Sequence, residues 1–198
     1  VSSGINQAIV RVRDSQQLYQ EACRIAVEQG ALRMAWIGLH DRATEALKPV
    51  AYGGPDEPFP DTLVVSVRDV PEGQGAAGTA FRTGRFAFTN DIEADPRFEA
   101  WRELVQARGY RSCAAFPLHV DNRPGGVLVL YADQTGYFDQ EELQLLNSLA
   151  ENISFAVASE ENERQRKCAE NALRENQRQL TTLFSNLPGM AFQCRPDA

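Results

Sequence analysis

The stretch from residue 109 to residue 131 constrains the fold of this chain more than any other. Two apolar runs of strand length, residues 109–120 and 127–131, flank a short loop rich in Asn, Pro and Gly. That arrangement is typical of an antiparallel hairpin. Because both runs are almost continuously apolar, neither face of the hairpin is expected to be open to water. The sequence therefore predicts helices over one face and a second layer, where a ligand can bind, over the other.

The segments around the hairpin supply more strands and the helical cover. Further strand-like runs lie at residues 34–39, 47–52, 63–67 and 85–89. Apolar stripes at helical spacing predict helices at residues 5–12 and 15–30, the second capped by Asp14. Another helix is predicted from Pro96, after the capping residue Asp95. We expect a mixed α/β (α+β) domain in three layers, α/β/α, around an antiparallel sheet of five or six strands.

Several motifs in a fixed order resemble the C-terminal half of a GAF domain, a small sensory module of signalling proteins. They are Gly109-Tyr-Arg-Ser112, Phe116-Pro-Leu118, the run from Gly126 to Tyr131, and Phe138-Asp-Gln-Glu-Glu-Leu143 followed by an apolar helix. The resemblance extends over residues 15–159. It implies a GAF-like sensory domain at residues 1–159, in which a loop and a short helix form a lid over the second face of the sheet.

A glycine-rich segment spells a motif that elsewhere binds dinucleotides. Gly73, Gly75 and Gly78 have the spacing G-x-G-x-x-G, which cradles a pyrophosphate when it directly follows a strand and opens a full crossover helix. Here five residues separate the motif from the preceding strand, and Gly84 ends the following helix after residues 76–83. We therefore interpret the segment as a turn in which backbones pack closely.

One long helix is predicted from residue 139 to residue 186, with Asp139 as its cap and Glu142 as the partner in a capping box. Its first half carries an apolar seam that suits both a core face and a coiled coil, and a second seam, offset from the first, follows a charged segment. The members of the two seams are Leu146, Ala150, Ile153 and Val157, then Leu173, Leu180 and Leu183. A helix of this length is expected to pair with a second copy and to carry a signal.

The last residues resemble the linker helix and first strand of a PAS domain, over residues 170–194. This resemblance implies a linker or coiled-coil signalling helix at residues 160–186 and a truncated PAS-like start at residues 187–198. It also implies an output domain further along the chain. By family analogy that domain is a diguanylate cyclase, a phosphodiesterase or a histidine kinase of a two-component system.

Composition excludes several classes of function. A net charge of −7 and a pI near 4.9 argue against a nucleic-acid partner, which needs a basic surface. No apolar run is long enough for membrane insertion, and no signal peptide is present, so a cytoplasmic location is expected. The four cysteines (Cys23, Cys113, Cys168 and Cys194) and two histidines are widely spaced, so no metal is predicted, and no cofactor is indicated.

Candidate ligand-binding residues cluster around the predicted lid and hairpin. They are Trp36, Phe88, Asp91, Trp101, Tyr110, Arg111, Ser112 and Cys113. A mostly apolar cavity with a few oriented polar groups is the usual composition of a small-molecule site. The alternative for each aromatic residue is that it simply fills the core, and for Cys113 that it is a small buried hydrophobe.

Three hypotheses follow. The first is a sensory module that forms a homodimer through its terminal helices, binds an unidentified small molecule and regulates a downstream domain in the same chain. The second keeps the fold as a dimerisation spacer without a ligand. The third is a cysteine-dependent redox enzyme acting through Cys113. It is disfavoured because GAF-type methionine sulfoxide reductases keep cysteines in their lid, whereas residues 59–110 contain none. We therefore expect this fragment to be regulatory, with no catalytic residues.

Overall fold

The computed structural model describes residues 14–55, 64–120 and 123–185. The chain divides into two units, residues 1–160 and residues 161–198. The helix predicted at residues 5–12 and the PAS-like start at residues 187–198 lie outside the described residues. The domain boundaries proposed from the sequence stay predictions.

A six-stranded antiparallel sheet forms the middle of the domain, in the order β3-β2-β1-β6-β5-β4. The strands are β1 (Met34–Asp41), β2 (Ala46–Gly53), β3 (Val65–Ser66), β4 (Ala87–Thr89), β5 (Ser112–Val120) and β6 (Arg123–Ala132). The predicted hairpin is confirmed as β5 and β6, with Cys113 opposite Tyr131 and Phe116 opposite Leu128. Both of its faces are apolar because one packs against helices and the other against the lid described below.

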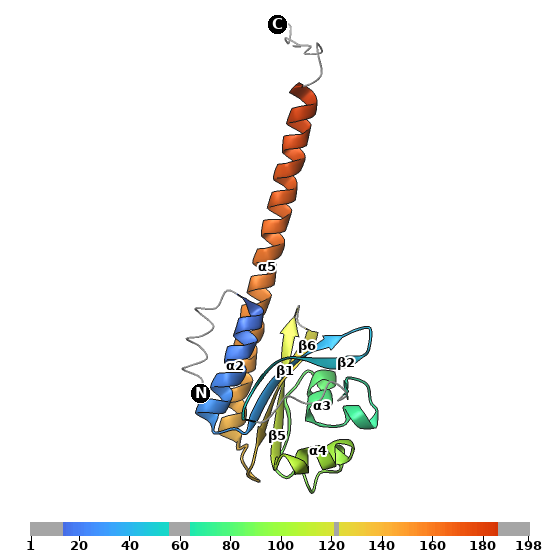
Figure 1. The fold of residues 1–198 in the computed structure, drawn as a ribbon, viewed down its shortest axis with the longest axis vertical. Coiled ribbons are helices and arrows are strands. Elements are labelled where there is room, and N and C mark those ends of the chain that lie inside the picture. The colour runs from blue at the N-terminus through green and yellow to red at the C-terminus, as the bar shows by residue number, and fades with distance from the viewer. Residues whose placement is uncertain (1–13, 56–63, 121–122, 186–198) are drawn as a thin grey trace. The chain divides into compact units, whose positions relative to one another are not determined.

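Helices cover one face of the sheet, as predicted. α2 (Ser15–Gly30) and the first turns of α5 (Gln140–Ser185) lie side by side on this face (Figure 1). Ile25 of α2 and Leu146 of α5 join one buried cluster with Phe116 and Leu128 of the hairpin. α2 begins where the Asp14 carboxylate accepts a hydrogen bond from the Gln16 N–H at 3.1 Å.

The lid covers the opposite face and confirms the three-layer α/β/α architecture (Figure 1). It consists of the 3₁₀ helix η1 (Pro71–Gly73), α3 (Ala76–Thr83), the 3₁₀ helix η2 (Pro96–Trp101) and α4 (Arg102–Ala107). The single helix expected from Pro96 is thus two short helices. They are separated because the backbone of Trp101, at φ −114° and ψ −2°, leaves helical geometry.

The glycine-rich segment is a packing turn, which confirms that interpretation. A Cβ atom on Gly73 would lie 2.0 Å from the carbonyl oxygen of Arg68, and one on Gly78 would lie 2.2 Å from the carbonyl oxygen of Gly73. Arg82 ties the same turn together, because its Nη1 donates to the carbonyl oxygens of Arg68 at 2.9 Å and Gly73 at 2.7 Å. Backbone and guanidinium therefore fill the space around these glycines.

α5 continues through its charged segment, as predicted. It begins after Asp139, whose carboxylate accepts a hydrogen bond from the Glu142 N–H at 2.8 Å. In the charged segment Arg166 pairs with Glu163 at 3.0 Å and with Glu170 at 2.5 Å. Within the described residues, no helix has the length and apolar content needed to cross a membrane.

The two predicted seams of α5 are in different environments. Leu146, Ala150 and Ile153 are buried within the domain, and Val157 packs at the edge of the same cluster. Leu173 and Leu180 are 61% and 52% exposed. The side chain of Leu183 lies outside the described residues. The first seam is covered by its own sheet, whereas Leu173 and Leu180 of the second are open to solvent.

Candidate ligand-binding site

A small, nearly closed cavity lies between the sheet and the lid. Its volume is about 20 Å³, which is room for about one water molecule. Strands β1, β5 and β6 contribute Trp36, Cys113 and Tyr131, and the lid contributes Ala76, Ala77, Phe98, Trp101, Leu104 and Val105. Within the described residues no charged side chain lines this cavity. The site is therefore apolar, with a few groups that can form hydrogen bonds.

Cys113 and Tyr131 form the polar part of the cavity floor. They are direct partners across β5 and β6 and both are buried. Burial raises the pKa of the Cys113 thiol, against smaller lowering effects of a hydrogen bond with Tyr131 and of the Arg97 charge. Burial likewise raises the pKa of the Tyr131 hydroxyl well above its ordinary value. Both groups are consequently neutral at physiological pH.

A second tyrosine supports this floor from behind. The ring of Tyr110 stacks on Tyr131 with a centroid separation of 4.6 Å. The Tyr110 hydroxyl donates a hydrogen bond to the Met34 sulfur at 3.1 Å. These contacts fix the ring of Tyr131, and so the position of its hydroxyl relative to Cys113.

Arg97, held by an ion pair with Asp95, fastens the lid to the edge strand β4. The Asp95 carboxylate accepts from the Arg97 backbone N–H at 3.0 Å and from the Arg97 Nη2 at 2.6 Å. The same Nη2 donates to the carbonyl oxygen of Phe88 in β4 at 3.0 Å. Burial alone would raise the pKa of Asp95, but hydrogen bonds from Arg97 and Thr89 outweigh it and hold the pKa below its ordinary value. We call the Asp95–Arg97 pair the latch.

Trp101 closes the cavity above Gly75. Gly75 is the N-cap of α3, and a Cβ atom there would lie 3.5 Å from Cδ1 and Nε1 of the Trp101 ring. The Trp101 side chain is only partly buried, so it separates the cavity from solvent. The two tryptophans of the chain, Trp36 and Trp101, therefore both line the same cavity.

The structure brings some of the predicted site residues together and separates others. Trp36, Trp101 and Cys113 line the cavity, and Tyr110 stacks behind it. Phe88 does not line the cavity and is 37% exposed at the edge of the sheet.

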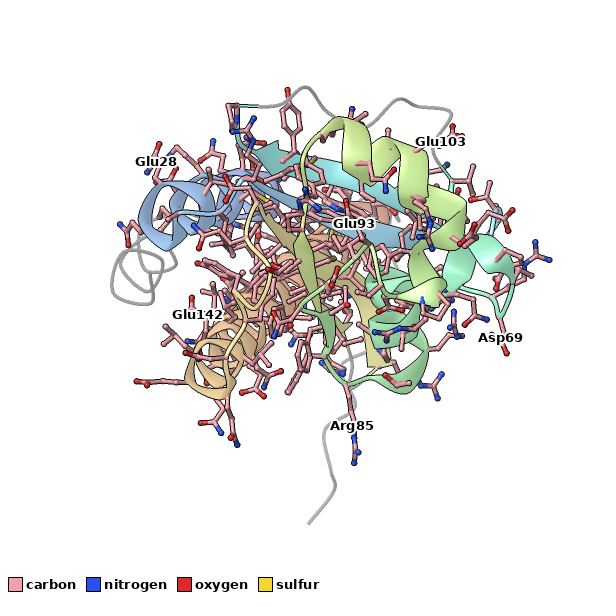
Figure 2. All side chains as sticks on the ribbon, turned by 90° about the horizontal axis from the view of Figure 1, so that it is seen from below. Glu28, Asp69, Arg85, Glu93, Glu103 and Glu142 are labelled. Atoms are coloured by element: carbon pink, nitrogen blue, oxygen red, sulfur yellow. The ribbon has the colours of Figure 1, made fainter. Side chains whose placement is uncertain are left out.

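The three remaining polar candidates lie outside the cavity. Asp91 is exposed, and its carboxylate accepts the Glu93 N–H at 3.1 Å, which shapes the loop after β4. Arg111 pairs at 2.6 Å with Glu93, which is labelled in Figure 2. Ser112 donates its hydroxyl to the carbonyl oxygen of Gln134 at 2.8 Å. These contacts of Asp91, Arg111 and Ser112 stabilise strand ends and loops and do not reach the cavity.

Sequence reasoning missed other residues of this site. Tyr131 ends a continuous apolar run, so the sequence does not distinguish it from its neighbours. It lies at even spacing from Val127 and Val129, which face the lid side of the sheet, and this spacing could have indicated its position. Phe98 lies in the helix predicted from Pro96, where the sequence indicates no particular role for it. Arg97 carried no sequence signal, since its position beside the cavity depends on the fold of the lid.

Comparison with known proteins identifies the family. The sequence profile of the GAF domain matches residues 12–158, and this chain therefore belongs to the GAF domain family. Over 122 residues it is 29% identical to the methyl sulfide methyltransferase-associated sensor of Methanosarcina acetivorans. That match covers 61% of this chain and 12% of the relative, so the chain spans only a small part of that protein.

Solved structures share the fold at low sequence identity. The free methionine-R-sulfoxide reductase of Neisseria meningitidis, solved with its substrate, has a TM-score of 0.69 at 19% identity, covering 82% of this chain and 89% of that chain. The GAF domain of a phosphoenolpyruvate-protein phosphotransferase from Coxiella burnetii has a TM-score of 0.69 at 16% identity, covering 82% and 93%. These likenesses show the fold.

The comparisons correct one prediction. The expectation that this fragment has no enzymatic activity is contradicted, because free methionine-R-sulfoxide reductases recur among the proteins with this fold. That expectation relied on the absence of cysteines from residues 59–110, which bears on one type of catalysis, whereas the fold as a whole also supports catalysis in those proteins. A regulatory role for this chain therefore needs support from its own site.

Proposed function

We propose that the GAF domain of this chain is a sensory module that binds a small, mainly apolar molecule between the sheet and the lid. The observation that carries this proposal is the small apolar cavity lined by Trp36 and Trp101, with the neutral polar pair Cys113 and Tyr131 at its floor. Such a combination is typical of small-molecule sites. The name of the Methanosarcina relative, a sensor, supports the same class of function.

Binding must be coupled to movement of the lid. The cavity of about 20 Å³ is too small for any ligand larger than water. A ligand therefore binds an open state, in which η2 has moved away from α3, and shifts the population toward it. The latch opposes this opening because its Arg97 also donates to the Phe88 carbonyl oxygen of β4. Opening breaks this bond to β4, whereas Asp95 and Arg97 lie on the same segment and stay paired. Ligand affinity thus depends on how easily the bond to β4 breaks.

The signal is carried by α5 to a partner and to a downstream domain. α5 is one continuous helix that includes Leu146 in the domain core and the exposed Leu173 and Leu180. Leu173 and Leu180 are one heptad apart, a spacing that suits a homodimeric coiled coil. In this proposal the protein acts in the cytoplasm, and the downstream domain is a cyclic-di-GMP enzyme or a histidine kinase.

A cavity-filling variant tests the proposal against the ligand-free spacer. Ala77 of α3 lines the cavity and is 7% exposed, so Ala77→Leu occupies the space that a ligand needs. Ala107→Leu adds the same side chain to the exposed end of α4 and is the matched control. The wild type and both variants are analysed by native mass spectrometry as purified, and then for changes in tryptophan fluorescence during screening of small apolar compounds.

The sensor proposal predicts a bound molecule, or a compound that changes the fluorescence of the wild type and of Ala107→Leu but not of Ala77→Leu. Folded proteins that retain nothing and respond to no compound would favour the spacer. Because enzymes share this fold, free methionine-R-sulfoxide is assayed on the same samples with a thiol reductant. Its reduction by the wild type would replace the sensor proposal with an enzymatic one.

A further inference from the structure

An open groove lies on the outer side of the lid wall that closes the cavity. Its volume is about 380 Å³, and Asp69, Gln74, Arg97 and Glu99 contribute its polar lining. Asp69 and Glu99 are both exposed, and Asp69 is labelled in Figure 2. The groove runs between the segment around η1 and the 3₁₀ helix η2.

The groove and the cavity share a thin wall. On η2, Phe98 and Trp101 line the cavity, whereas Arg97 and Glu99 line the groove. At the opposite side of the wall, Gln74 lines the groove and its neighbour Gly75 lines the cavity. A displacement of η2 that lifts Trp101 from Gly75 would therefore join the two spaces into one site.

Arg97 is held rigidly at this wall. Its Nε and Nη2 donate to Asp95, and Nη2 also donates to the Phe88 carbonyl oxygen. Its Nη1 donates no hydrogen bond within the described part of the chain. Arg97 also lies near enough to Cys113 for its charge to act on the thiol at the cavity floor. A donor held in place by Asp95 is thus available on the groove side of the wall.

The charges around this wall disfavour an ionised ligand. Asp95 already neutralises Arg97. The groove carboxylates Asp69 and Glu99 are likewise paired, with Arg82 at 4.0 Å and Arg102 at 2.6 Å, so the groove offers an anion no uncompensated positive charge. The apolar cavity would also strip water from any charge that entered it. An uncharged molecule avoids this cost and still accepts a hydrogen bond from the guanidinium.

We propose that Arg97 determines ligand specificity and that the ligand is a small uncharged molecule with an apolar body and one hydrogen-bond-accepting oxygen, as in a ketone or an amide. The apolar body occupies the enlarged cavity beside Trp36 and Phe98, and the oxygen accepts from the Arg97 Nη1. This assignment rests on the proposed function, because it assumes that the cavity binds a ligand.

Three matched probes test this assignment: cyclohexyl methyl ketone, methylcyclohexane and cyclohexanecarboxylate. Their dissociation constants are measured by ligand-observed saturation-transfer NMR with the whole chain. The proteins are the wild type, Arg97→Met, which keeps an apolar stem without donors, and Arg85→Met. Arg85 is exposed and points away from the domain in Figure 2, so it is the matched control. The double variant Asp95→Asn/Arg97→Met avoids an unpaired buried carboxylate if Arg97→Met alone is unfolded.

The wild type and Arg85→Met are expected to bind the ketone roughly tenfold more tightly than either other probe, which is the usual effect of a hydrogen bond to a charged donor. In Arg97→Met, or in the double variant, that preference is expected to disappear, while methylcyclohexane binds at least as tightly as before because the bond to Phe88 no longer opposes opening. Equal binding of the ketone and methylcyclohexane, or tightest binding of the carboxylate, would overturn the assignment and leave the sensor proposal intact. If none of the probes binds the wild type, this assignment fails, and the sensor proposal is decided separately by the mass-spectrometric and fluorescence tests above.

Discussion

Replacing Gly78 with alanine tests the structural role of the glycine-rich segment most directly. A Cβ atom at this position would lie 2.2 Å from the Gly73 carbonyl oxygen and 2.8 Å from that of Ser66. Both contacts are with backbone, so α3 and the η1 turn must move apart. Overpacking typically costs about 1–3 kcal/mol, and two contacts with backbone that cannot turn away place this site at the upper end, about 3 kcal/mol. Alanine in a helix gains at most about 1 kcal/mol over glycine. We expect a net loss of about 2 kcal/mol, which corresponds to a fall in Tm of roughly 4–8 °C.

Gly75→Ala is the matched control within the same motif. The added Cβ would lie 3.5 Å from Trp101, an ordinary contact, and the Gly75 φ of −59° suits any residue. We expect the Tm of Gly75→Ala to fall by less than about 2 °C, mainly because alanine is a poorer N-cap than glycine. Both melting temperatures are measured by circular dichroism. If Gly78→Ala were as stable as the wild type, or if Gly75→Ala lost more stability than Gly78→Ala, close backbone packing would not be the reason for these glycines.

Three further predictions concern the latch, the thiols and the helix. Asp95→Ala removes the cap of η2 and the partner of Arg97, and we expect a loss of about 1–3 kcal/mol at pH 7 in urea unfolding. Folding lowers the pKa of Asp95. The ionised Asp95 carboxylate therefore stabilises the folded protein fully above its unfolded pKa of about 3.9. This stabilisation is lost as the pH falls through the folded pKa. The difference from the wild type should therefore vanish in acid, and a difference independent of pH would refute the latch. Iodoacetamide at pH 8 should modify the exposed Cys168 in minutes but leave the buried Cys113 intact until the protein unfolds. Peptide mass spectrometry measures both modification rates, and equal rates at the two thiols would mean that the lid opens readily. The double variant Leu173→Ser/Leu180→Ser should weaken self-association, measured by sedimentation, without changing Tm. A particle mass equal to that of a dimeric wild type would exclude this seam as the dimer contact.

The local pattern of the sequence determined most of the architecture. The continuous apolar runs on both sides of the loop at residues 121–126 predicted a hairpin with both faces covered, and β5 and β6 have that position. Asp14 and Asp139 correctly marked where α2 and α5 begin. These features are readable because strand periodicity and helix caps depend on residues close together in the chain.

The division of the site between the two faces of the sheet was decided only by the fold. Ser112 and Cys113 are neighbours in sequence, so both were candidates, but successive side chains of a strand point to opposite faces. Cys113 lines the cavity, whereas Ser112 bonds to Gln134 outside it. Choosing between them requires knowing which face carries the lid.

The composition of the cavity wall was likewise a tertiary result. Phe98 and Arg97 are adjacent in η2, yet one lines the cavity and the other the outer groove. Cys113 and Tyr131 meet because β5 and β6 pair in a particular register. The sequence by itself determined the elements, their order and the need for two covering layers. Only the tertiary structure decided which side chains share the cavity, because their contacts depend on strand register and on the docking of the lid.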